Sequence, residues 1–315
     1  MVERSNREPG GEPLVLGQIH RRRFLAAATA AAGGALIAEG TWAAQPKKQP
    51  AAAPPAFLDL RDSNFITSVK DQGTCNACTA FAIVATVEAT FNKKHGQNGA
   101  QGPDLDELEL FSQPTSPHGG CNTSHWWPRD ALLRCQSRSL AWEGNPAKPR
   151  LPIAGFQSLL DPNNKVRETQ KAMKQWLVDT GPVAAVMIQY EDFHNWGKSW
   201  AQQYPGKKNC NVYTPGAQWA PCASTTLSSS TQSKVRSGAG SAPPPVPIVG
   251  GHVVSIVGYD DRGANKHWIC KNSWGPTWNG DGYVLIAQGS PSASGPQGVG
   301  SCYIDFIDVW GIRMN

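Results

Sequence analysis

The 315-residue sequence lacks three features that would each point to a particular class of protein. Its net charge is only +5, and no block of lysine and arginine marks a nucleic-acid-binding surface. Its N-terminal apolar run, 24–38, is shorter than the roughly 18–20 residues of a membrane-spanning helix, and Gly33 and Gly34 interrupt it. No segment repeats at a fixed period. These absences argue against a nucleic-acid-binding protein, a membrane-spanning protein and a repeat protein, and they leave a globular protein with a substantial core.

The first 43 residues have the composition of an export signal. A basic stretch precedes the apolar run 24–38, and the small residues Thr41 and Ala43 follow it, as a cleavage site requires. The segment Arg21–Leu25 resembles the twin-arginine signal of bacteria, which is an address read by a receptor and not an anchor. We therefore predict a signal peptide over 1–43, no stable membrane anchor after its cleavage, and a periplasmic or secreted protein in which disulfides persist.

Patterns typical of helices come first in the remaining sequence, and patterns typical of strands follow. Helices are predicted at 78–95, 103–111, 127–138 and 166–181, and short strands at 182–190, 252–260, 267–274 and 282–287. After a Pro/Ala-rich linker at 44–56, this order predicts one α+β domain over 57–315 with two lobes, a helical lobe at about 70–160 and a β lobe at about 161–315. A Ser/Gly/Pro-rich stretch at 223–248 is predicted to be a flexible insertion.

Cys75 and Cys78 form a Cys-x-x-Cys pair with three possible uses: a zinc site, a redox dithiol, or one structural cysteine beside one nucleophile. A zinc site needs a second close pair of ligands, and the remaining cysteines form none. A thioredoxin-like dithiol would follow the first strand of a βαβ unit, whereas a helical half follows this pair. The third use is favoured, and no metal or other cofactor is predicted.

A cysteine nucleophile needs a general base and a group that holds this base in place, and two later motifs supply candidates for these two roles. His252 starts a strand-like run, and Asn272 lies in the next one, which reads as the second strand of a hairpin. Cys78 begins a predicted helix, whose N-terminal N–H groups lower the pKa of a thiol, and an adjacent imidazolium lowers it further. Asn272 can accept a hydrogen bond from the imidazole N–H and so hold the ring without adding a charge.

Three short motifs carry a resemblance to a known family. QGTCNAC (72–78), GHVVSIVGY (251–259) and KNSWG (271–275) occur in the order seen in the papain family of cysteine peptidases. The chain resembles this family from about residue 57 to its C-terminus. The His and Asn motifs lie farther from the first motif than the family's usual spacing, and the insertion at 223–248 falls in that interval.

The resemblance implies a role for each of five residues. Cys78 matches the nucleophile, His252 the general base and acid, and Asn272 the residue that orients the imidazole. Gln72 matches a side-chain donor of the oxyanion hole, and the backbone N–H of Cys78 is the second donor. Trp274 matches the indole that shields the His–Asn hydrogen bond from water.

The resemblance also suggests how the cysteines pair. Cys75 matches a structural half-cystine with Cys121 as its partner, and a second bridge is expected between Cys222 and Cys302. An odd number of cysteines remains once the nucleophile is set aside, so at least one more thiol must be free. Cys270, in the strand before the candidate asparagine, is the expected free thiol.

Substrate contacts are implied by the same resemblance. The pocket for the side chain two residues before the cleaved bond is expected near Val186, Val253 and Ile307, so an aliphatic or aromatic side chain is preferred there. The family's glycine pair that hydrogen-bonds the substrate backbone is replaced by Thr123 and Ser124, and Ser124 is the substrate-binding candidate at this wall.

The sequence thus predicts a cysteine endopeptidase that acts on peptides or proteins. Two other functions use the same residues. An acyl transferase or amidase would share the thioester intermediate but use an amine in place of water. A catalytically weak pseudo-peptidase would only bind peptides, which the loss of the glycine pair favours and the intact candidate catalytic set opposes.

Overall fold

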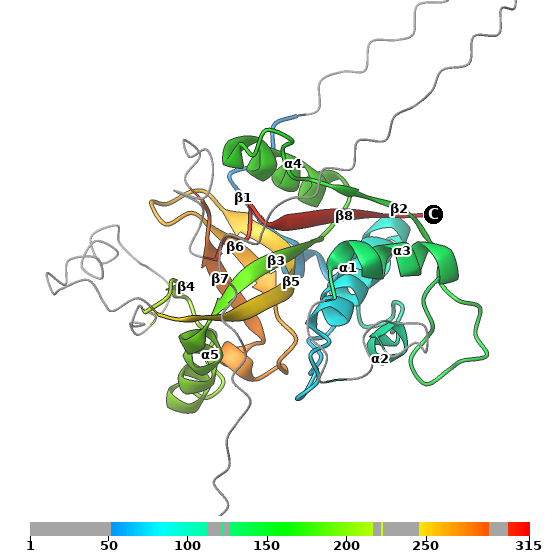
Figure 1. Cartoon of the computed structure of the whole chain (residues 1–315), viewed down its shortest axis with the longest axis horizontal. Helices are drawn as coiled ribbons and strands as arrows, with labels where there is room; N and C mark the ends of the chain where they lie inside the picture. Colours follow the sequence, from blue (N-terminus) through cyan, green and yellow to red (C-terminus); the bar gives the residue numbers. More distant parts are fainter. Residues whose placement is uncertain (1–51, 112–120, 122–125, 217–221, 223–245, 290–301) are drawn as a thin grey trace, which may run out of the picture. The chain divides into compact units, whose positions relative to one another are not determined.

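The structure is a computed structural model that describes residues 52–111, 121, 126–216, 222, 246–289 and 302–315. Residues from Pro54 to Asn315 form one compact unit (Figure 1). The predicted signal peptide, most of the linker and most of the insertion lie outside the described residues. In the part of the chain that is described, no helix is long and apolar enough to cross a membrane.

Five α-helices, eight strands and two short 3₁₀ turns are present in the described part of the chain. The helices are α1 (Cys78–His95), α2 (Glu107–Phe111), α3 (Pro128–Arg138), α4 (Val166–Asp179) and α5 (Glu191–Gln203), and the turns are η2 (Leu60–Ser63) and η4 (Trp278–Gly280). The strands are β1 (Phe57–Asp59), β2 (Ile153–Ser158), β3 (Val183–Tyr190), β4 (Val212–Tyr213), β5 (Ile248–Asp260), β6 (His267–Lys271), β7 (Tyr283–Ala287) and β8 (Asp308–Met314).

All of the strands belong to one sheet, with the order β2-β8-β3-β5-β6-β7-β4, and β1 pairs with β5 (Figure 1). Every pairing is antiparallel except that of β4 with β7. The helices of the first half pack beside this sheet, which confirms the predicted α+β fold class. β5 lies between β3 and β6, so His252 pairs with Met187 of β3, and Ser255 pairs with Lys271 of β6.

Helix α1 begins at Cys78 and ends as its sequence predicts. Its residues are buried on almost every side, as suits its mostly apolar sequence. Lys93, Lys94 and His95 occupy the last turn, where cations interact favourably with the helix dipole. Gly96 then adopts a left-handed conformation with φ of 62°, which closes the helix.

The buried hydrophobic side chains form two large clusters. The larger one lies among the strands with α4 and α5, and it includes Met187, Tyr259 and Trp268. The other surrounds α1 and includes Ile83 and Leu132. The cluster around α1 consists mostly of residues from the predicted helical part, but it also includes Ala184, Ile312 and Met314 from the predicted β part, and both clusters belong to one compact unit.

Helix α2 is shorter than the predicted helix at 103–111 and begins only at Glu107. Leu105 is held in a bridge with Trp142, and its N–H donates to a carboxylate oxygen of Glu88 at 2.9 Å. These contacts keep the chain extended before the helix, and the sequence did not reveal them.

Strand and helix limits differ from the predictions at three other places. β5 begins at Ile248, so His252 lies inside this strand, while β6 ends at Lys271, so Asn272 directly follows it. The N–H of Asn272 donates to the carbonyl of Gly282, the residue before β7, at 3.0 Å. Helix α5 was not predicted at all.

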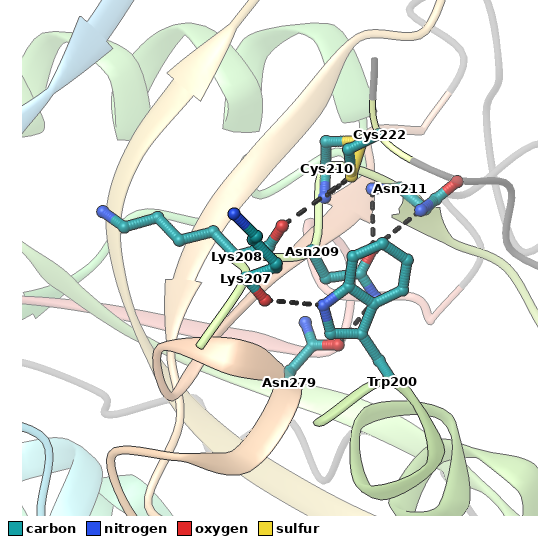
Figure 2. The surroundings of a disulfide bond; sticks show 8 residues. All are labelled: Trp200, Lys207, Lys208, Asn209, Cys210, Asn211, Cys222 and Asn279. Atoms are coloured by element: carbon teal, nitrogen blue, oxygen red, sulfur yellow. Dashed lines mark hydrogen bonds between the residues drawn. A yellow bond between two sulfur atoms is a disulfide. The ribbon is translucent and has the colours of Figure 1, made fainter. Parts of the chain in front are cut away.

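Two disulfides are present. Cys75 is bonded to Cys121, as expected. The expected Cys222–Cys302 pair is wrong, because Cys222 is bonded to Cys210 (Figure 2). Cys302 is fully buried in the cluster among the strands, and Cys222 is partly exposed. Cys270 is a free thiol, as expected.

Candidate active site

Four candidate catalytic residues come from four different segments. Cys78 is the first residue of α1, and Gln72 lies in the loop before it. His252 lies in β5 and Asn272 directly after β6. The sulfur of Cys78 interacts with the backbone N–H of Val253, the residue after His252. The start of α1 therefore lies against the part of β5 that carries the histidine.

His252 and Asn272 form a buried hydrogen-bonded pair. The imidazole Nε2 lies 2.7 Å from Oδ1 of Asn272, and the two residues are only 2% and 3% exposed. Because an amide oxygen only accepts hydrogen bonds, this contact places the proton on Nε2 and leaves Nδ1 free to accept one.

Aromatic side chains cover this pair. The ring of Trp274 lies 4.8 Å from that of His252, with 31° between the ring planes. Phe193 of α5 packs against Trp274 at 5.3 Å and approaches the imidazole at 6.1 Å. Trp278 closes the stack edge-on to Trp274 at 5.0 Å. The hydrogen bond between His252 and Asn272 is thereby kept in an apolar environment, where an electrostatic interaction is stronger than in water.

Gln72 is fixed at both ends of its amide. Its Nε2 donates to the carbonyl of Cys75 at 2.7 Å, and its Oε1 accepts a hydrogen bond from Ser273 Oγ at 2.6 Å. The side-chain nitrogen of glutamine carries two N–H groups, so one remains after the bond to Cys75. The amide is oriented beside the start of α1, within the turn that leads to the candidate nucleophile.

Burial shifts the pKa values of Cys78 and His252 in the directions that favour the uncharged form of each. It raises the pKa of the Cys78 thiol, although the backbone N–H groups of Val253 and Thr79 act in the opposite direction. It lowers the pKa of His252 to about 4, and the hydrogen bond to Asn272 acts against this shift. Transfer of the thiol proton to the imidazole keeps the net charge of the pair at zero, so each charge would have the other as its counter-ion.

The residues expected to line the substrate pocket do come together. Val186, Val253 and Ala82 form a small buried cluster, and Cys78 and Ile307 pack against it. The cluster presents no charged group beside the candidate nucleophile. Ser124, the remaining substrate-binding candidate, lies outside the described residues.

Sequence reasoning missed a group of charges next to this site, formed by the buried Glu88, Glu107 and Lys271 and the partly exposed Lys70. A weak signal was present, because Glu88 interrupts an otherwise apolar helix and Lys271 is next to the candidate asparagine. It also missed the covering role of Phe193, although the spacing of apolar residues in α5 is helical.

Comparisons with known proteins agree with this geometry. The model of the "Papain family cysteine protease" family matches residues 54–145 and 222–304, which is more than half of the chain. Fruit bromelain from Ananas comosus is 25% identical over 260 residues, with 79% of this chain and 59% of the relative covered. Cathepsin R from Mus musculus is 24% identical over 274 residues, with 77% and 63% covered. The chain thus spans about 60% of the length of these two relatives.

Solved structures show the same fold. The bromelain protease from Ananas comosus, determined in complex with the E64 inhibitor, is 22% identical with a TM-score of 0.53, and the match covers 83% of this chain and all of that one. Procathepsin L2 from the larval midgut of Tenebrio molitor is 18% identical with a TM-score of 0.56, covering 84% of this chain and 70% of that one.

Proposed function

Because this chain belongs to the papain family of cysteine proteases, we propose that it is an endopeptidase that hydrolyses peptide bonds through Cys78, His252 and Asn272. The observation that supports this most directly is the buried 2.7 Å hydrogen bond between His252 and Asn272 beneath Trp274. It leaves one imidazole nitrogen for the thiol at the start of α1. No metal or cofactor takes part in the proposed reaction.

The first half of the reaction forms an acyl-enzyme. The imidazole of His252 takes the thiol proton, and the Cys78 thiolate attacks the carbonyl carbon of the substrate, so that a C–S bond forms and the carbonyl oxygen becomes an oxyanion. When the tetrahedral intermediate collapses, the C–N bond breaks and His252 gives its proton to the leaving amine. The product is a thioester on Cys78 and a free amine.

The second half returns the enzyme to its starting state. His252 removes a proton from a water molecule that attacks the thioester carbonyl, and the C–S bond then breaks. The acid product leaves, and the proton on the imidazole returns to the Cys78 sulfur. Asn272 keeps the ring in the orientation that both halves need.

Negative charge on the carbonyl oxygen needs donors in both halves. We assign this role to the second N–H of the Gln72 side chain and to the backbone N–H of Cys78. The contacts of Gln72 with Cys75 and Ser273 support the assignment, because a donor that is already oriented stabilises the oxyanion without reorganisation. Loss of one such donor typically costs about 3–4 kcal/mol of transition-state stabilisation.

The substrate is proposed to be a peptide or protein with an apolar side chain two residues before the cleaved bond. Val186, Val253 and Ile307 support this preference, because a charged side chain would be buried among them without a partner. Ser124 is proposed to contact the substrate backbone.

Export is a separate proposal. We propose that residues 1–43 direct the protein out of the cytoplasm as a twin-arginine-type signal. The two disulfides of the folded part support an oxidising destination, such as the periplasm or the exterior of the cell.

Labelling with a thiol-directed peptidyl epoxide tests the proposed function. The other cysteines outside the two disulfides, Cys135, Cys270 and Cys302, are buried, so modification should map to Cys78 alone and should abolish peptide hydrolysis. The Cys78→Ala variant is the control, and it should be neither labelled nor active. Rapid cleavage by Cys78→Ala, or a label on another cysteine, would contradict the proposal. If added amines suppress acid formation and become acylated, the enzyme is an acyl transferase instead.

A further inference from the structure

Beneath the candidate active site lies a group of four charged side chains that the proposed reaction does not use. The ionic cluster consists of Lys70, Glu88, Glu107 and Lys271, which come from the loop before α1, from α1, from α2 and from the end of β6. The Nζ of Lys70 lies 2.9 Å from a Glu107 oxygen and 3.7 Å from a Glu88 oxygen. Glu88 is 1% exposed and Lys271 is 5% exposed, so these two charges lie in the protein interior. Lys70 lies at the edge of the cluster, where its Nζ also contacts the exposed carboxylates of Asp104 at 2.6 Å and Glu143 at 3.0 Å.

Thr67 connects the two halves of the ionic cluster. The ammonium group of Lys271 donates to Thr67 Oγ1 at 2.9 Å, and this hydroxyl donates to Glu88 Oε2 at 2.7 Å. The other oxygen of Glu88 accepts the N–H of Leu105 at 2.9 Å. The Thr67 hydroxyl therefore acts as acceptor and donor at once, and this pattern joins the three side chains directionally.

The loop that carries Gln72 is already bonded to the segment after β6. The N–H of Gln72 donates to the Ser273 carbonyl at 2.8 Å, and the N–H of Gly275 donates to the Lys70 carbonyl at 3.2 Å. Helix α1 joins these segments through the ionic cluster, because Glu88 belongs to α1 and Lys70 belongs to the loop.

Two members of the ionic cluster are close in the chain to candidate catalytic residues. Lys271 directly precedes Asn272, and Glu88 lies about three turns along the helix that begins with Cys78. A small cavity of about 10 Å³ is lined by Glu88, Lys271 and Asn272 together with Phe81, so the cluster and the asparagine face the same space. A helix moves as a rigid body over this length, so a shift at Glu88 also moves Cys78.

Stability alone does not account for these charges. Burial raises the pKa of Glu88 and lowers that of Lys271 to about 8, so each charge is held against the cost of removing it from water. Replacing a buried ionic group with well-packed apolar residues is often neutral or stabilising. What apolar packing does not supply is a fixed direction and distance between the groups.

We infer that the ionic cluster and Thr67 are positioning residues, which hold α1 at a fixed place relative to the end of β6 and so set Cys78 against His252 and Asn272. The inference rests on the proposed function. A displacement of the thiol by a fraction of an ångström weakens its proton transfer and its attack more than it disturbs the substrate pocket, because Val186, Val253 and Ile307 do not belong to α1. Removing the connection should therefore lower kcat much more than it changes KM.

The Thr67→Val variant tests this inference, because it removes the connecting hydroxyl and keeps the volume and every charge. We expect kcat for a peptide substrate to fall about tenfold and KM to change by less than about twofold. Thr67→Ser keeps the hydroxyl and should restore kcat to within about twofold of the unmodified protein. Thermal unfolding of each variant, followed by circular dichroism, verifies that the assayed protein is folded.

Thr169→Val is the matched control. Thr169 lies in α4, is 2% exposed, and its hydroxyl accepts one hydrogen bond, from the N–H of Asp161 at 2.9 Å. The change is chemically the same but lies away from the ionic cluster, so kcat should remain at the level of the unmodified protein. An equal loss of kcat in Thr169→Val, or an unchanged kcat in folded Thr67→Val, would overturn the inference.

A second variant decides the case if Thr67→Val does not fold. Glu88→Gln/Lys271→Met removes one charge of each sign and leaves the Lys70–Glu107 pair, so we expect it to fold and to show the same tenfold fall in kcat. Failure of this double variant to fold, or its full activity, would assign the cluster to stability alone. Inactivity of the unmodified protein would instead contradict the proposed function, so the two failures are distinguishable.

Discussion

The two sides of the candidate site are held in place by different means. On the β5 side, His252 lies in a strand that is paired along both edges, with β3 and with β6, so many backbone hydrogen bonds hold it in place. On the α1 side, Cys78 follows Ala77, which makes no side-chain capping bond, and its helix is tied by the Cys75–Cys121 disulfide and by the ionic cluster. A single change should therefore displace the α1 side more easily than the β5 side.

The largest loss of activity should come from removing the imidazole of His252, the general base of the proposed reaction, which belongs to the β5 side. We expect His252→Gln to lower kcat/KM by roughly a thousandfold, in the range of general acid–base catalysis, because no base remains for the thiol. Circular dichroism should show a folded protein, since the strand pairing does not depend on the imidazole.

The same variant measures how His252, on the β5 side, changes the reactivity of the Cys78 thiol on the α1 side. Burial raises the pKa of the Cys78 thiol. In the proposed reaction, the imidazolium of His252 is the counter-charge that favours the thiolate. Without it, the rate of alkylation by iodoacetamide at neutral pH should fall, and its midpoint should move to higher pH. An unchanged pH profile of alkylation in His252→Gln would show that the two residues do not share a proton.

The next largest effect concerns the disulfide on the α1 side. The Cys75–Cys121 bond spans a sequence separation of 46 residues, so the chain-entropy model gives a loss of about 4 kcal/mol in the free energy of unfolding when it is removed. Because the carbonyl of Cys75 also holds Gln72, the Cys75→Ser/Cys121→Ser variant should lose activity as well. Urea unfolding and peptide hydrolysis measure the two effects. An activity equal to that of the unmodified protein would show that the α1 side does not need the Cys75–Cys121 disulfide for catalysis.

Local signals in the sequence predicted much of the site, and long-range contacts account for what was missed. The start of α1 at Cys78 and its end at Gly96 follow from residues next to each other in the chain. The pairing of β5 with β6 follows from two adjacent apolar runs. The ionic cluster, by contrast, joins four segments, and no local pattern in the sequence brings Lys271 to Glu88 through Thr67.

Two misses have more specific causes. The partner of Cys222 depends on which cysteine the folded chain brings close to it, and the order of the cysteines in the sequence does not show this. The resemblance therefore suggested the wrong partner. Helix α5 begins directly after β3 without a break, and the apolar run of the strand concealed its start. The helical spacing of Phe193, Trp196 and Trp200 was nevertheless visible in the sequence.

The smallest effect is expected from the disulfide on the β5 side, between Cys210 and Cys222. It spans only 12 residues, so the chain-entropy model sets about 3 kcal/mol as the loss on its removal. Other contacts hold the segment before it (Figure 2): Asn209 donates to Asn279 at 2.8 Å, and Trp200 donates to the Lys207 carbonyl at 2.7 Å. They should keep this segment in its native place when the disulfide is removed.

Activity should distinguish the two disulfides more clearly than stability does. The Cys210–Cys222 bond makes no contact with His252 or Asn272 among the described residues, and the pairing of β5 with β3 and β6 does not include it. We therefore expect Cys210→Ser/Cys222→Ser to keep kcat/KM within about twofold of the unmodified protein, measured at a temperature where urea unfolding shows both to be folded. A large fall in kcat/KM in this variant would mean that the β5 side also depends on a disulfide, and the contrast between the two sides would no longer hold.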